Sequence, residues 1–107
     1  RFQLSCRRYL PGQGIRLHHD RREMFAESVY GCVLENTSSS ALEFQQQSRS
    51  GQVLRRFCVD ELPGCCLRQR GEARFEWVHG VEQLTHGERV SVTWRWFSPE
   101  FLLQPGG

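Results

Sequence analysis

Histidines beside an aspartate give the sequence its clearest chemical pattern. His18, His19 and Asp20 stand together, and His79 follows much later in the chain. Alternate side chains of an extended strand point to the same side, so His18 and Asp20 would share a face and His19 would point away. With His79 from another strand, two imidazoles and one carboxylate would hold one face of a divalent ion, as in non-haem iron(II) sites. The spacing alone also fits a surface pair with an unrelated histidine.

Two arginines, Arg89 and Arg95, lie six positions apart in a second segment of chemical interest. They share a strand face, about 20 Å apart at ~3.3 Å per residue, and both could address one deep polar cavity. A buried arginine needs an anion, and the guanidinium fork suits a carboxylate such as one end of a dicarboxylate. Two solvent-exposed arginines on an edge strand are the alternative. Polar and apolar residues alternate in this segment, which predicts a strand with one polar and one apolar face. The apolar face consists of Val90, Val92, Trp94 and Trp96.

The elements that must position these residues are short strands. Gly-, Pro-, Ser- and Asn-rich turns recur along the chain and separate strand-like runs. We predict strands at residues 2–9, 15–18, 28–34, 41–46, 52–59, 65–70, 74–79 and 89–97. Helical signals are confined to a turn or two within residues 20–26. About eight short strands predict an all-β fold with minor α content, a double-stranded β-helix jelly roll whose mouth can hold a ligand.

Length and charge narrow the function classes. The 107 residues predict one domain spanning 1–107, and because the chain opens on Arg1 we expect it to be an excerpt of a longer chain. Fourteen arginines and no lysine against twelve acids give a net charge of +2, too low for a dedicated nucleic-acid clamp. No apolar run approaches the ~20 residues of a membrane span, so we expect no membrane partner.

The five cysteines do not suggest a disulfide framework. They are Cys6, Cys32, Cys58, Cys65 and Cys66. An odd number cannot all pair, and adjacent cysteines do not easily bridge each other. We therefore expect small, buried thiols and an intracellular, reducing compartment, with the organelle unknown.

Taken in order, the motifs resemble a known enzyme family. They are Tyr9-Leu10-Pro11-Gly12, His18-His19-Asp20, His79-Gly80-Val81, and Arg89 followed six residues later by Arg95. Their joint occurrence is similar to the AlkB family of iron(II)- and 2-oxoglutarate-dependent dioxygenases. Leu62-Pro63 and the stretch from Gly71 to Gly80 look most like the branch that acts on the wobble uridine of tRNA.

The resemblance implies roles for six residues. His18, Asp20 and His79 match the iron ligands, and Tyr9 matches a tyrosine that hydrogen-bonds 2-oxoglutarate. Arg89 matches the arginine that pairs with its distal carboxylate, and Arg95 matches the arginine near its metal-proximal end. It also implies an oxidoreductase that uses Fe(II), 2-oxoglutarate and oxygen to hydroxylate or oxidatively demethylate a modified nucleobase, in RNA rather than DNA.

The chain departs from the family pattern at two positions. Arg7 stands where the family has Asn, and an arginine cannot accept a hydrogen bond. Arg22 stands where DNA-repair members carry an acid, which speaks against DNA repair. A catalytically silent module of a larger assembly is therefore an alternative function. A cupin-like zinc or manganese site without 2-oxoglutarate is another, but it leaves Arg89 and Arg95 unexplained.

Two further groups of residues have competing interpretations. Trp77, Trp94 and Trp96 are expected in the jelly-roll core, with stacking on a flipped base as the alternative. A basic cluster is expected near the mouth, as a solvated rim or as a phosphate contact: Arg7, Arg8, Arg16, Arg21 and Arg22.

Overall fold

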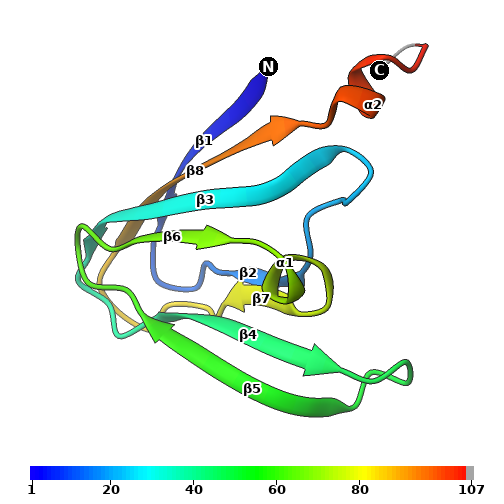
Figure 1. Cartoon of the computed structure of the whole chain (residues 1–107). Coiled ribbons are helices and arrows are strands. Elements are labelled where there is room, and N and C mark those ends of the chain that lie inside the picture. Colours follow the sequence, from blue (N-terminus) through cyan, green and yellow to red (C-terminus); the bar gives the residue numbers. More distant parts are fainter. Residues whose placement is uncertain (106–107) are drawn as a thin grey trace.

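The chain folds as two four-stranded antiparallel sheets that face each other (Figure 1). The structure, a computed structural model, describes residues 1–105. Its strands are β1 (Phe2–Tyr9), β2 (Ile15–His18), β3 (Phe25–Asn36), β4 (Ala41–Gln47), β5 (Val53–Asp60), β6 (Cys66–Gln69), β7 (Val78–Val81) and β8 (Arg89–Phe97). Two short helices are α1 (Glu72–Phe75) and α2 (Pro99–Leu102). Neither of them has the length and apolar character to cross a bilayer.

The order of the strands identifies the architecture. One sheet runs β1-β8-β3-β6 and the other β2-β7-β4-β5. The chain changes sheet after every strand except β4, which continues into β5 of the same sheet. This winding is that of a double-stranded β-helix, so the predicted all-β jelly roll is confirmed.

Most predicted strands form, but the seventh begins later than expected. Residues 72–75 form α1 instead of strand. Arg74 is buried there, and its guanidinium donates hydrogen bonds to the carbonyl oxygens of Asp20 (2.5 Å) and Arg21 (3.2 Å). These bonds fix the segment against residues 20–21, and β7 starts only at Val78. The helical signal at 20–26 gives a single turn, closed by the Phe25 amide on the Arg21 carbonyl, before β3 begins.

The last strand turns its polar face inward, which corrects the expectation for two tryptophans. Arg89 and Ser91 are buried between the sheets, whereas Trp96 is 44% exposed. Trp94 lies on the same outer face, stacked on Tyr30 with ring centroids 5.5 Å apart. Placing them in the core was wrong, because charged side chains occupy the space between the sheets. Trp77, by contrast, is partly buried against the core as expected.

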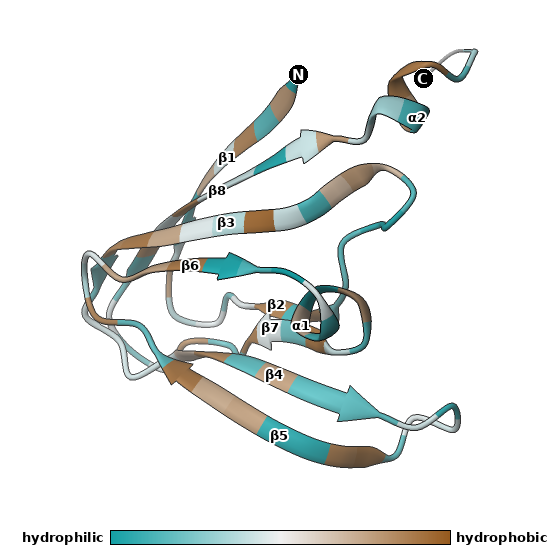
Figure 2. Ribbon diagram, viewed as in Figure 1, coloured by the Kyte–Doolittle hydropathy of each residue, from teal (hydrophilic) through white to brown (hydrophobic). Residues whose placement is uncertain are grey.

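The outer face of this sheet is apolar beyond β8. In β1, Leu4 pairs with Trp94 and Phe2 with Trp96, and these two β1 residues are 62% and 58% exposed. Hydrophobic and hydrophilic residues alternate along β1 (Figure 2). Because successive side chains alternate between faces, the hydrophobic set faces outward.

The buried hydrophobic cluster lies against the second sheet. Partly buried side chains pack on it, from Ile15, Val59, Leu67 and Trp77. The cluster itself consists of Tyr9, Leu42, Phe44, Val81 and Leu84. The core therefore adjoins β7, which carries one of the predicted metal ligands.

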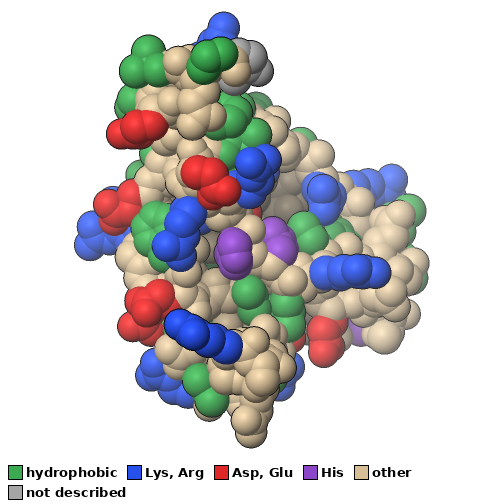
Figure 3. Space-filling model, turned by 90° about the vertical axis from the view of Figure 1, so that its right-hand side faces the viewer, with side chains coloured by type: hydrophobic (Ala, Val, Ile, Leu, Met, Phe, Trp, Pro, Cys, Tyr) green, Lys and Arg blue, Asp and Glu red, His purple; other side chains and the backbone are tan. Residues whose placement is uncertain are grey.

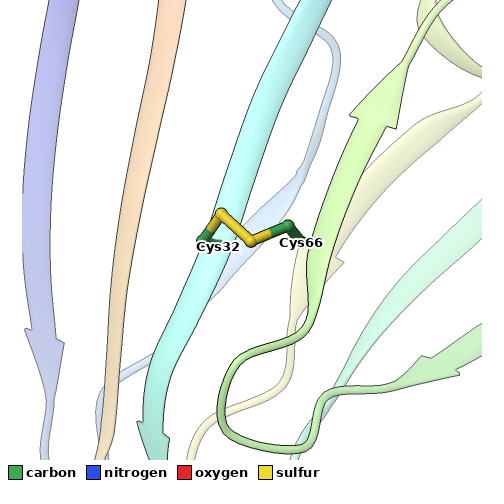
Figure 4. Close-up of a disulfide and its surroundings, with 2 residues drawn as sticks. All are labelled: Cys32 and Cys66. Atoms are coloured by element: carbon green, nitrogen blue, oxygen red, sulfur yellow. A yellow bond between two sulfur atoms is a disulfide. The ribbon is translucent and has the colours of Figure 1, made fainter.

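A disulfide joins Cys32 of β3 to Cys66 of β6 (Figure 4), with Cα atoms 4.1 Å apart. Cys6 and Cys58 are exposed free thiols and Cys65 is partly buried. The expectation of five reduced, buried thiols was therefore wrong. The disulfide was not predicted because Cys32 and Cys66 meet through the pairing of β3 with β6, which the spacing of the cysteines in the sequence does not reveal. The intracellular, reducing compartment stays a prediction.

We predict that the double substitution of Cys32 and Cys66 by Ala lowers the free energy of unfolding. The bond closes a loop of 34 residues, and constraint of the unfolded chain predicts a loss of about 3–4 kcal/mol. Urea denaturation under non-reducing conditions measures it. The matched control replaces the exposed Cys6 and Cys58 by Ala and should change stability by less than about 0.5 kcal/mol. Equal stability of the two double variants would contradict the disulfide.

Candidate functional site

Pairing of β2 with β7 brings the predicted imidazoles together. His18 lies directly opposite His79 in the antiparallel register, and their ring centroids are 4.5 Å apart. Gly80 makes this pairing possible, since a Cβ there would lie 2.7 Å from the Ile15 carbonyl oxygen. The approach of the two strands thus depends on the glycine beside His79.

Asp20 completes a cluster of three possible metal ligands. One donor atom each from His18, Asp20 and His79 lies within 4.8 Å of the others. The Nε2 atom of His18 is 3.5 Å from Oδ1 of Asp20, which is 6% exposed. His19 is exposed and outside the cluster, as alternation along the strand predicts. Histidine side chains reach the surface near the middle of the face drawn in Figure 3, with cationic side chains on several sides.

Hydrogen bonds around the cluster leave donor atoms free for an ion. The Nδ1 atom of His18 donates to the Arg16 carbonyl oxygen at 2.7 Å, which orients the ring so that Nε2 faces Asp20. Arg95 donates from Nη1 to Oδ2 of Asp20 at 2.6 Å, while Oδ1 faces His18. The Nδ1 atom of His79 is buried with no hydrogen-bond partner among residues 1–105. Two imidazoles, one of them with this unpartnered nitrogen, and a carboxylate fit a divalent transition-metal ion.

The protonation states of His79 and Asp20 suit metal binding. Burial and, secondarily, the neighbouring His18 lower the pKa of His79 to about 4, so that its imidazole is neutral near pH 7. Burial alone would raise the pKa of Asp20, but hydrogen bonds from His18 and Arg95 outweigh it and hold that pKa well below its usual range. The hydrogen bond to Asp20 raises the pKa of His18. A carboxylate and a neutral imidazole are the ligand forms that a metal requires.

Arg89 lines the cavity between the two sheets, together with the three candidate ligands, and it already has an anionic partner. Oε1 of Glu61 accepts hydrogen bonds from its Nε (3.0 Å) and Nη2 (2.6 Å) atoms, and Ser91 accepts one from Nη1 (3.2 Å). The guanidinium carbon lies 5.0 Å from the ring centroid of Tyr9. Arg89 and Tyr9 therefore lie together, as predicted. Glu61 was missed because it belongs to no motif and follows β5, far from Arg89 in sequence.

Arg95 is held at the other end of the cavity. Besides its bond to Asp20, it donates to the Gln3 amide oxygen from Nε and Nη2, at 3.1 and 2.7 Å. Its guanidinium also lies 4.5 Å from the ring centroid of Phe25. Arg95 thus orients a candidate metal ligand, a role that its position in the motif does not reveal.

The cavity between the sheets connects the metal cluster with Arg89. Its volume is about 130 Å³. Its polar lining includes His18, Asp20, Glu61, His79, Arg89, Ser91 and Arg95, with Arg7 and Tyr9. This space accepts a small molecule but not a polymer, so a large substrate has to approach from the surface.

The basic cluster expected at the mouth is divided. Arg7, Arg8 and Arg16 line a separate surface groove, where Arg8 is paired with Glu88 at 2.8 Å. Arg22 donates instead to the carbonyl oxygen of Phe75 at 2.8 Å. The five arginines therefore do not form one continuous phosphate-binding rim, because Arg8 and Arg22 are held by these local contacts.

Comparison with known proteins supports the fold. No family model and no curated protein matches the chain. A prolyl-4-hydroxylase from Pseudomonas putida superposes with a TM-score of 0.67 and 20% identity over 90% of this chain. The chain spans about half of that protein, 52%. An RmlC-like cupin protein from Desulfovibrio desulfuricans aligns over 88% of this chain and 71% of its own, at 20% identity and a TM-score of 0.49.

We predict one binding site for Mn(II), used as a stable substitute for iron(II). Calorimetric titration should show one ion per chain and no measurable binding to His79→Ala, since the remaining imidazole and carboxylate do not make a complete facial site. The matched control, His19→Ala, removes a neighbouring exposed imidazole and should bind as the parent does. Parent-like affinity in His79→Ala would show that the three residues are not the ligands.

Proposed function

We propose that the chain is the catalytic core of an iron(II)- and 2-oxoglutarate-dependent dioxygenase of the AlkB type. The observation that carries this proposal is the placement of His18, Asp20 and His79 in one cavity with Arg89 and Tyr9. The fold of the prolyl-4-hydroxylase supports the same class of chemistry. Fold alone does not assign an activity, so the argument depends on these side chains.

Each residue has a task in this proposal. His18, Asp20 and His79 hold the metal on one face, and Arg95 keeps the Asp20 carboxylate ionised and oriented. Arg89 and Tyr9 receive the distal carboxylate of 2-oxoglutarate, with Ser91 supporting the guanidinium. When bound, iron and 2-oxoglutarate activate oxygen to hydroxylate a substrate carbon, and 2-oxoglutarate is converted to succinate and carbon dioxide.

For the substrate we propose a modified nucleobase in RNA, hydroxylated or oxidatively demethylated. The order of motifs shared with the AlkB family supports this choice. So does Arg22, which stands where DNA-repair members of that family carry an acidic residue. The arginines that line the surface groove offer contacts for a phosphate backbone. A protein side chain is the alternative substrate, in keeping with the prolyl-4-hydroxylase neighbour.

A catalytically silent module within a larger assembly is the second candidate function. The observation in its favour is the ion pair of Arg89 with Glu61, whose two side chains are each 5% exposed. Glu61 already neutralises the Arg89 guanidinium, which is the group that a cosubstrate carboxylate would need to bind. Arg7 in place of the family Asn points in the same direction.

We predict that the chain converts 2-oxoglutarate to succinate in the presence of iron(II), ascorbate and oxygen. Slow turnover should occur without substrate, and it should rise with a methylated RNA oligonucleotide more than with the DNA counterpart or a proline-rich peptide. Succinate is measured by mass spectrometry, with Asp20→Ala as the inactive control. Absence of succinate from protein that binds both metal and 2-oxoglutarate would favour the silent module. Stimulation by the peptide alone would overturn the nucleobase assignment.

We predict that Tyr9→Phe weakens 2-oxoglutarate binding without unfolding the chain. The substitution keeps the buried ring, which packs with Leu42 and Phe44, and removes the hydroxyl. Loss of one hydrogen bond predicts about 1 kcal/mol, roughly a fivefold change in affinity. Titration of the Mn(II)-loaded protein measures the change, and Tyr30→Phe on the outer face is the control. Unchanged affinity in Tyr9→Phe would remove this residue from the cosubstrate site.

A further inference from the structure

Arg89 is buried in a fully formed ion pair, although the proposed function gives it a different anion to bind. It is 4% exposed and Glu61 is 6% exposed. One carboxylate oxygen of Glu61 receives both hydrogen bonds of the Nε–Nη2 edge. Ser91 accepts from Nη1, so every nitrogen of the guanidinium has a partner. The guanidinium is thus held in place before any ligand is bound.

The charges in the cavity are balanced in pairs. Asp20 neutralises Arg95 at one end, and Glu61 neutralises Arg89 at the other. Among residues 1–105, Asp20 and Glu61 are the only acids that line the cavity, and the remaining cation, Arg7, is exposed. A second carboxylate arriving at Arg89 would therefore meet a neutral pair. It would also lie close to a like charge in a place where water screens poorly.

The position of Glu61 allows its side chain to be displaced while its backbone stays fixed. The residue follows the last residue of β5, and its carbonyl oxygen accepts a hydrogen bond from the Asn36 side chain at 3.0 Å. Rotation of the side chain alone would separate the carboxylate from Arg89. No movement of the sheet is needed to exchange one carboxylate for another.

We propose that Glu61 is a specificity-determining residue of the cosubstrate site, a resident counter-ion that the distal carboxylate of 2-oxoglutarate has to displace from Arg89. Glu61 thereby lowers the preference of the site for a 2-oxo dicarboxylate over a 2-oxo monocarboxylate of equal length. This inference rests on the proposed function. It differs from a purely orienting role, in which removing the charge of Glu61 leaves 2-oxoglutarate affinity unchanged or weaker.

The test compares two ligands that differ only at the distal end. Isothermal titration of the Mn(II)-loaded protein measures binding of 2-oxoglutarate and of 2-oxopentanoate, which carries a methyl group in place of the distal carboxylate. The variant is Glu61→Gln, whose amide oxygen still accepts from Arg89 but carries no charge. The matched control is Glu43→Gln, which removes the charge of a buried carboxylate paired with Arg56 outside the cavity.

In the parent we expect 2-oxoglutarate to bind less than about tenfold more tightly than 2-oxopentanoate, because a free buried guanidinium would contribute more than that. Glu61→Gln should tighten 2-oxoglutarate by at least about tenfold, ~1.4 kcal/mol, and leave 2-oxopentanoate unchanged. Glu43→Gln should behave as the parent. If Glu61→Gln does not fold, the ratio of the two ligand affinities in the parent protein tests the proposal by itself.

Two results would overturn the inference, and they are distinguishable. A parent preference above tenfold, or one that Glu61→Gln leaves unchanged or reduces, removes the specificity role and leaves the proposed function intact. Failure of both 2-oxo acids to bind any of the three proteins, with Mn(II) bound, removes the inference together with the proposed cosubstrate.

Discussion

Two ion pairs are the constraint on which the rest of this fold depends: Glu61 with Arg89, which is buried, and Asp20 with Arg95, in which only the carboxylate is buried. Charged groups are costly to bury unless they are paired and hydrogen-bonded, and removal of one partner leaves an uncompensated charge. Each pair joins residues distant in sequence, so the sheets, the turn at residues 20–25 and the end of β5 must all be in place together. The cavity and its chemistry therefore form only in the fully folded chain.

The same constraint explains why apolar side chains of β1 and β8 lie on the outer face of their sheet. Because the polar side chains of β8 point into the space between the sheets, its tryptophans and the apolar side chains that β1 pairs with them are left on the outside. Trp96, Phe2 and Leu4 are exposed for this reason. The compensating hydrophobic core lies against the other sheet, around Phe44 and Val81.

The sequence alone predicted most of the strands because they follow from local periodicity. It also predicted that His18, Asp20 and His79 lie together, but His79 entered that prediction through the family resemblance and not through periodicity. Alternation along β2 was enough to place His18 with Asp20, and the turn residues delimited β1, β2 and β8. What it could not predict were contacts set by tertiary structure. Nothing near Glu61 indicates that it meets Arg89, and alternation in β8 gives two faces without saying which is buried. The bond between Cys32 and Cys66 depends likewise on the β3–β6 register, which cysteine spacing does not encode.

The size of the cavity separates the question of what chemistry it can support from the question of which large substrate the chain recognises. The cavity of about 130 Å³ between the sheets has room for a small molecule, and Asp20, Glu61 and Arg89 in its lining are buried and hydrogen-bonded. A nucleobase or a peptide must instead be recognised by surfaces outside this space, where side chains are exposed and free to vary. The motif residues that line the cavity are Tyr9, His18, Asp20, His79, Val81, Arg89 and Arg95. They therefore bear on the chemistry proposed for the cavity far more strongly than on the identity of the substrate, and the same arrangement is compatible with RNA or protein.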